Sequence, residues 1–150
     1  MRGAPINILL VEDDIVDKEM FLRTLKKNTI TNPLIIASNG EEAVEILSTR
    51  LLDKPLLIIL DLNMPRMTGL EFLHELRLDN HYADSVVFVM TTSAASSDKK
   101  AVSAYDIAGF LVKSEMGEQF SNVFSSLLCY FDIIDLEEGQ KAIVLKAPKT

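Results

Sequence analysis

The sequence of 150 residues contains a single cysteine, Cys129, and this scarcity limits the settings in which the chain can work. No disulfide can form within the chain, and a lone thiol in an apolar stretch is usually a small buried side chain. We therefore expect a reducing, cytoplasmic location. No apolar run approaches the roughly 18 residues of a membrane span, and residues 1–5 do not resemble an export signal. We expect neither membrane insertion nor export.

Basic residues are also in deficit. The chain has 15 Lys and Arg against 22 Asp and Glu, which gives a net charge of −7 and an isoelectric point near 4.8. Binding to nucleic acid or to anionic lipid needs clustered positive charge, so both partners are disfavoured. The apolar content of 48% is sufficient for one continuous core. These values predict one globular domain.

Five short apolar runs divide the sequence, and each has the length of a strand. They are Ile6–Val11, Leu34–Ala37, Leu56–Leu60, Val86–Met90 and Phe110–Val112. The runs are nearly continuous in Ile, Leu and Val instead of alternating with polar residues. This pattern is typical of strands that are covered on both faces in a parallel sheet.

Helix-like segments separate and follow these runs. They are Asp14–Lys27, Glu41–Leu52, Leu70–Leu78, Ser97–Tyr105 and a last segment with apolar residues at three- and four-residue spacing from Phe120 to Ile134. The fourth has small residues and a weak pattern, so we expect it to be the least firmly packed. The alternation predicts an α/β, doubly wound, flavodoxin-like (βα)5 domain with a five-stranded parallel sheet of order 2-1-3-4-5. We assign residues 1–136 to this domain and 137–150 to a C-terminal tail without an output domain.

Carboxylates follow two of the expected strands directly. Glu12, Asp13 and Asp14 come after the first run, and Asp61 comes after the third. In the order 2-1-3-4-5 these strands are neighbours about 4.8 Å apart, and their loops diverge at the topological switch point. Carboxylates brought this close repel each other, and a hard divalent cation relieves the repulsion. Oxygen-only ligands favour Mg²⁺, and the lack of a nearby Cys or His disfavours zinc.

The same edge of the sheet carries the groups that phosphoryl transfer requires. An aspartate can attack phosphorus to form an acyl phosphate, and Asp61 is the candidate nucleophile. Lys113 closes the fifth run, where its ammonium could pair with Asp61 or with a phosphoryl oxygen. Thr91 closes the fourth run and offers a hydroxyl donor.

Other polar residues near these runs have simpler interpretations. Asp14 precedes a helix and is better explained as an N-cap than as a metal ligand, although a shifted register would make Asp13 and Asp14 the metal pair. His74 and His81 have no metal-ligand partner in pattern and are expected at the surface. Tyr105 lies in the fourth helix-like segment and not at the end of the fifth strand.

Four motifs resemble response regulator receiver domains, of the kind that includes the chemotaxis regulators. They occur in the family's order and spacing: Leu10-Val11-Glu12-Asp13-Asp14, Leu60-Asp61-Leu62-Asn63-Met64-Pro65 with Gly69, Met90-Thr91-Thr92-Ser93, and Gly109-Phe110-Leu111-Val112-Lys113. The resemblance spans residues 6–135. Four separated motifs that agree are far more specific than any one of them.

The resemblance implies a role for each matching residue. Asp61 is then the phosphoacceptor, and the Mg²⁺ ligands are Asp13, Glu12 acting through water, Asp61 and the backbone carbonyl of Asn63. Thr91, Lys113 and Phe110 contact the phosphoryl group or follow it as the switch, and Asn63 and Ser93 tune the lifetime of the phosphorylated state.

The resemblance also implies a function and partners. The chain would take part in a two-component phosphorelay: it would receive phosphate from a histidine kinase or phosphotransfer protein and switch a surface that binds a downstream protein. It would not be an enzyme, beyond slow self-dephosphorylation. Short regulators with a Lys-Ser pair and an extended tail resemble those of phytochrome-type kinases. Two departures from the family pattern are Ser114, where proline is usual, and Glu12, where Asp is commoner.

Two alternative functions remain open at this stage. A phosphatase of the haloacid dehalogenase type also uses an Asp nucleophile after a strand, but it usually has a second Asp two residues later, where this chain has Asn63. A docking domain that works without phosphorylation would not need the intact set of Asp13, Asp61, Thr91 and Lys113.

The tail contains an apolar patch suited to a partner or to a homodimer, formed by Ala142, Ile143, Val144 and Leu145.

Overall fold

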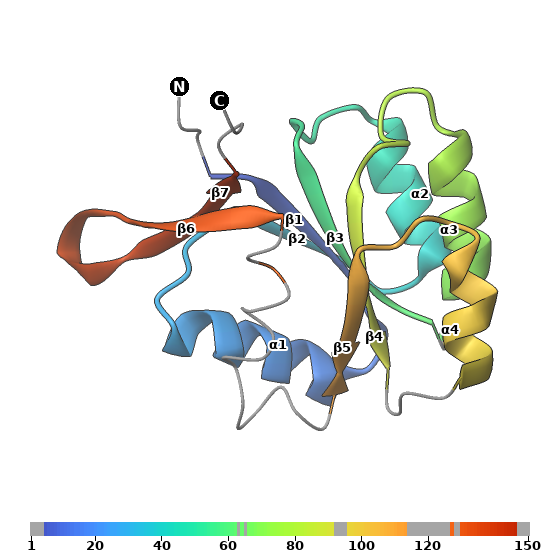
Figure 1. The fold of residues 1–150 in the computed structure, drawn as a ribbon, viewed down its shortest axis with the longest axis horizontal. Helices are drawn as coiled ribbons and strands as arrows, with labels where there is room; N and C mark the ends of the chain where they lie inside the picture. Colours follow the sequence, from blue (N-terminus) through green and yellow to red (C-terminus); the bar gives the residue numbers. More distant parts are fainter. Residues whose placement is uncertain are drawn as a thin grey trace.

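The computed structural model describes residues 5–62, 64, 66–91, 96–113, 127 and 130–146, without the side chains of residues 96–99. Its centre is a five-stranded parallel sheet in the order β2-β1-β3-β4-β5, which confirms the predicted α/β fold and strand order (Figure 1). The strands are β1 (Asn7–Val11), β2 (Leu34–Ala37), β3 (Leu56–Asp61), β4 (Val86–Thr91) and β5 (Gly109–Val112). Each lies within two residues of its predicted bounds.

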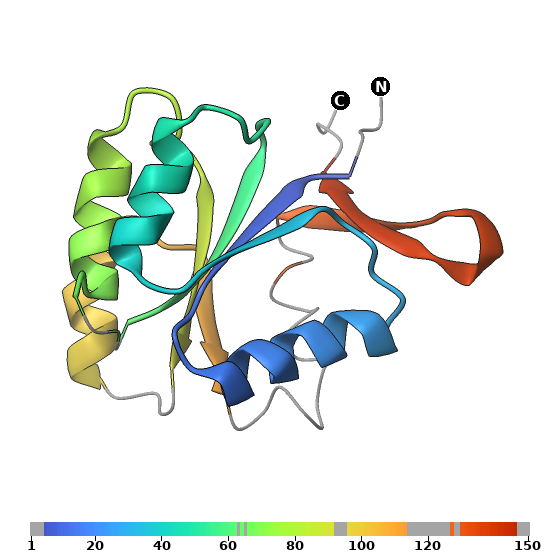
Figure 2. The ribbon, with the colours of Figure 1, turned by 180° about the vertical axis from the view of Figure 1, so that it is seen from behind.

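Helices cover both faces of this sheet. On one face lies α1 (Ile15–Lys27), and on the other lie α2 (Gly40–Ser48), α3 (Gly69–Leu78) and α4 (Ser96–Ser103) (Figures 1 and 2). Every residue of β3 is buried, and its side chains alternate between two apolar clusters, one under each layer of helices. Burial on both faces explains why the strand runs are continuously apolar.

Local chemistry sets where the helices begin and end. The side chain of Asp14 accepts a hydrogen bond from the backbone N–H of Asp17 at 3.1 Å, so the N-cap interpretation of Asp14 is confirmed. Thr68 and Glu71 form a reciprocal capping box at the start of α3. The predicted end of the second helix at Leu52 is wrong, because α2 ends at Ser48 and Arg50 adopts a φ of 58° that a helix cannot contain.

The last predicted helix is also wrong in its second half. Phe131–Asp135 forms strand β6, which pairs antiparallel with β7 (Lys141–Leu145). The hairpin spans the expected domain boundary at residue 136. Of the four residues expected to offer an apolar docking patch, Ala142, Ile143 and Val144 are at most 1% exposed because the chain itself covers them, and Leu145 is 50% exposed. The segment 114–126 of that predicted helix lies outside the described residues.

The hairpin is attached at the start of the sheet, at the edge opposite to the carboxyl ends of the strands (Figure 1). The N–H of Ile6, just before β1, donates to the carbonyl of Ile143 at 3.1 Å. The buried amide of Asn32 donates to the carbonyls of Ile6 and Ile143 and accepts from the N–H of Ile143. These bonds tie the hairpin to the end of the sheet at which β1 begins. In the described part of the chain, no helix has the length and apolarity needed to cross a bilayer.

Candidate functional site

Three carboxylates meet at the carboxyl edge of the sheet. One oxygen of each of Glu12, Asp13 and Asp61 lies within 4.8 Å of the others. Glu12 and Asp61 are buried, while Asp13 is the most exposed of the three. The structure therefore brings together the acids that the sequence predicted to converge, and Asp14 points instead into its own helix as a cap.

The sheet and α3 hold this cluster in place. Glu12 continues the pairing of β1, since its backbone N–H donates to the carbonyl of Ala37 at 3.0 Å. Asp61 is the last residue of β3 and leaves the sheet on the same face as Ile59, which is the face that α1 covers. At the start of α3, a Cβ on Gly69 would lie 2.6 Å from the carbonyl oxygen of Asp61. Only glycine allows α3 to begin this close to the acids.

Lys113 supplies the positive charge of the site. Its ammonium lies 3.1 Å from Glu12 Oε2 and 3.6 Å from Asp61 Oδ2, and it donates a hydrogen bond of 2.6 Å to Asp17 Oδ2. Burial lowers the pKa of Lys113, but the bond to Asp17 and the charges of Asp61 and Glu12 outweigh burial and raise it above its ordinary value. Lys113 is therefore a permanent cation at this edge.

Glu12 is the acid most affected by its surroundings. Burial raises the pKa of Glu12 to about 7, and the charge of Asp61 adds to this shift, while the Asp14 N–H and Lys113 oppose it. The backbone N–H of Asp14 donates to Glu12 Oε1 at 3.1 Å. Burial and the charge of Asp61 thus disfavour the charged form of Glu12 more than Lys113 and the Asp14 N–H favour it.

The donor set fits a hard divalent cation. Glu12 Oε2 is fully buried and, within the described part of the chain, makes no hydrogen bond even though it lies near Lys113. A buried carboxylate oxygen without a donor is costly unless a cation satisfies it. Three carboxylates, two of them buried, offer the oxygen ligands that Mg²⁺ and Mn²⁺ prefer.

Thr91 and Phe110 lie on the other face of the sheet. Thr91 ends β4, is 4% exposed and pairs in register with Val112 of β5. Phe110 pairs with Val89, two residues earlier on each strand, and packs against the cluster that includes Val102 of α4. The hydroxyl, the aromatic ring and α4 therefore share one side of the sheet. Asn63, Ser93 and Ser114 lie outside the described residues.

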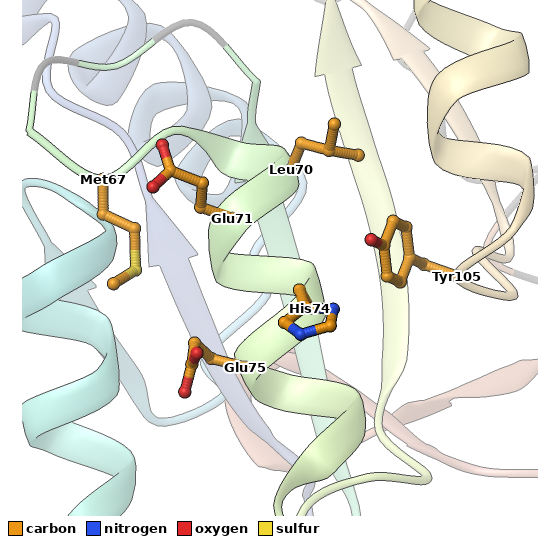
Figure 3. Close-up of a pocket in the computed structure, with 6 residues that line it drawn as sticks. All are labelled: Met67, Leu70, Glu71, His74, Glu75 and Tyr105. Atoms are coloured by element: carbon orange, nitrogen blue, oxygen red, sulfur yellow. The ribbon is translucent and has the colours of Figure 1, made fainter.

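A hollow of about 320 Å³ lies along α3 (Figure 3), and the residues that line it do not include Glu12, Asp13 or Asp61. His74 projects from α3 toward Tyr105, and their rings meet edge to face with centroids 6.2 Å apart. His74 and His81 are both exposed, as expected. Tyr105 follows α4 and packs on its side of the sheet, so it is not the aromatic of β5.

The sequence did not single out Asp17. Its position was visible, because it falls in the first turn of a helix that starts beside the acids. What the sequence could not show is that Lys113, 96 positions later, returns to contact it.

The family model described as the response regulator receiver domain matches residues 8–124. The chain belongs to this family. Response regulators of this type belong to two-component systems, which signal by phosphorylation. Response regulator Rcp1 of Synechocystis sp. is 35% identical over 116 residues, which cover 75% of this receiver chain and 79% of Rcp1. The transcriptional regulatory protein MalR of Bacillus subtilis is 35% identical over 120 residues, and the aligned part is 80% of this chain but only 49% of MalR.

Solved receiver structures share the fold. The bacteriophytochrome response regulator RtBRR superposes with a TM-score of 0.76 at 27% identity, covering 91% of this chain and 87% of RtBRR. The Mn²⁺-bound form of response regulator Rcp1 gives a TM-score of 0.66 at 33% identity, covering 81% of this chain and 88% of that one. The relatives thus include regulators linked to phytochromes, as the sequence resemblance implied.

Proposed function

We propose that this receiver domain accepts a phosphoryl group on Asp61 from a phosphohistidine of a histidine kinase or phosphotransfer protein. The observation that carries the proposal is the meeting of Glu12, Asp13 and Asp61 with Lys113 at one edge of the sheet. Asp61 is the nucleophile of this proposal, and it lies beside both the proposed cation site and the ammonium of Lys113.

The transfer follows from the chemistry of these groups. A carboxylate oxygen of Asp61 attacks phosphorus, the phosphorus–nitrogen bond of the donor breaks, and the imidazole leaves with the electron pair and takes up a proton. Glu12, Asp13 and Asp61 would hold Mg²⁺, which would supply neutralising charge for the phosphoryl oxygens. Lys113 pairs with one of those oxygens and orients the group. The backbone carbonyl of Asn63 and the tuning roles of Asn63 and Ser93 stay predictions.

The effect of phosphorylation is transmitted to the face of the sheet on which Thr91 and Phe110 lie. Phosphorylation adds nearly two negative charges next to Asp61, and Thr91 at the end of the neighbouring strand offers a hydroxyl to them. Movement of Thr91 frees space on the side of the sheet where Phe110 packs against the apolar cluster that includes Val102 of α4. The two-state element is therefore β4, α4 and β5, and its altered surface binds a downstream protein. Whether a second copy of the chain is such a partner stays a prediction.

Acetyl phosphate tests the proposal without knowledge of the kinase. Wild-type protein incubated with acetyl phosphate and Mg²⁺ is expected to gain the mass of one phosphoryl group, and EDTA should prevent the gain because the charge of the carboxylates then repels the donor. Intact-mass spectrometry measures both. An unmodified protein at saturating Mg²⁺ would favour a docking domain, and sustained release of phosphate from small esters would favour a phosphatase.

A further inference from the structure

The ammonium of Lys113 lies near three carboxylates, and the nearest of them belongs to Asp17, which is outside the acidic cluster of Glu12, Asp13 and Asp61. Its distance to Asp17 Oδ2 is 2.6 Å, against 3.1 Å to Glu12 and 3.6 Å to Asp61. Only the Asp17 contact has the geometry of a direct hydrogen bond from Lys113. The cation of the site is therefore held mainly by a residue of α1.

The position of Asp17 is fixed by the helix that contains it. Asp17 is the third residue of α1, and its N–H donates to the cap Asp14 at 3.1 Å. Phe21, one turn later, is buried in the cluster beneath the sheet. This anchoring keeps the Asp17 carboxylate, 22% exposed, beside Lys113, which is 10% exposed. A partly buried, charge-assisted hydrogen bond is stronger than an exposed ion pair.

We infer that Asp17 is a positioning residue that retains Lys113 in the unphosphorylated state and opposes its transfer to the phosphoryl group. The inference rests on the proposed function, in which Lys113 contacts a phosphoryl oxygen on Asp61. To make that contact, Lys113 gives up its shortest bond, and Asp17 is left without its counter-charge. Asp17 also adds a fourth negative charge to an edge that an anionic donor must approach. Both effects slow phosphoryl capture.

The variant Asp17→Asn removes the charge and keeps the size and the helix start. At saturating Mg²⁺, its rate of phosphoryl incorporation from acetyl phosphate is expected to rise about threefold to tenfold, because Lys113 is released and one repelling charge is gone. The affinity for Mg²⁺ should change in the opposite direction and fall about threefold, since the freed ammonium moves toward the cation site. A loss of local structure would lower both quantities together.

Three further variants make the test decisive. Glu19→Gln removes the same charge from an exposed position of the same helix and should leave the rate and the Mg²⁺ affinity within about twofold of wild type. Asp17→Glu restores the charge and should return the rate toward wild type. Asp17→Ser provides a second neutral side chain in case the asparagine variant folds poorly, which far-ultraviolet circular dichroism detects.

The outcomes separate this inference from the proposed function. Phosphorylation that is faster in Asp17→Asn and Asp17→Ser than in Glu19→Gln, together with weaker Mg²⁺ binding, supports it. Wild-type phosphorylation with an unchanged or slower rate in both neutral variants overturns the role of Asp17 and leaves the proposed function standing. Wild-type protein that takes up no phosphoryl group contradicts the proposed function itself.

Discussion

Asp61→Asn is expected to abolish phosphoryl incorporation and, at the same time, to stabilise the fold. The amide cannot form an acyl phosphate, so the chemical step has no nucleophile. Asp61 is 4% exposed and lies with Glu12 and Asp13, so removal of its charge relieves repulsion from two carboxylates, and its contact to Lys113, at 3.6 Å, is the longest of the three that Lys113 makes with carboxylates. The free energy of unfolding without Mg²⁺ should rise by about 1 kcal/mol at pH 7.

Intact-mass spectrometry and urea denaturation at pH 7 measure the two effects. The matched control is Asp132→Asn, which removes one carboxylate from the hairpin at the opposite edge of the sheet. This control should incorporate phosphate like wild type. Incorporation by Asp61→Asn at the wild-type rate, or destabilisation by more than about 1 kcal/mol, would contradict the arrangement of charges described for the site.

Lys113→Met has the largest expected effect on stability. Methionine fills the same space, but it leaves Glu12 and Asp61 buried without the ammonium that lies within 3.6 Å of both. Breaking a buried ion pair from one side costs several kcal/mol, and the ability of Glu12 to take up a proton limits the loss here to about 3 kcal/mol. Because a bound divalent cation supplies the missing charge, Mg²⁺ should recover much of the loss.

Urea denaturation with and without saturating Mg²⁺ gives the required comparison. Lys26→Met, an exposed lysine on α1, serves as the control and should change stability by less than about 0.5 kcal/mol in either condition. A Lys113→Met protein as stable as wild type without Mg²⁺ would show that the ammonium does not balance the buried acids.

The sheet and the acidic cluster could be predicted from the sequence because both depend on local pattern and on one rule of topology. Strands buried on two faces read as unbroken runs of Ile, Leu and Val, and Glu12 and Asp61 follow two such runs directly. In the order 2-1-3-4-5 those strands are neighbours, so the convergence follows without knowledge of any side-chain distance.

The parts that failed depend on contacts between distant segments. Phe131 and Ile134 fit the period of a helix, but pairing with β7 and the bonds from Asn32 to Ile143, 111 positions apart, make that segment a strand. The pairing of Lys113 with Asp17 is of the same kind. Spacing along the chain does not show which of several nearby acids a flexible lysine contacts, because small differences in distance decide which ion pair forms.

The central claim, that Asp61 is the phosphoacceptor, can be tested by locating the modified residue. Borohydride reduces an aspartyl phosphate to homoserine, so protein treated with acetyl phosphate and Mg²⁺ is reduced, digested and sequenced by tandem mass spectrometry. We predict homoserine at position 61 and unmodified aspartate at Asp13, Asp14 and Asp17. Homoserine at one of those three positions, with Asp61 intact, would contradict the account.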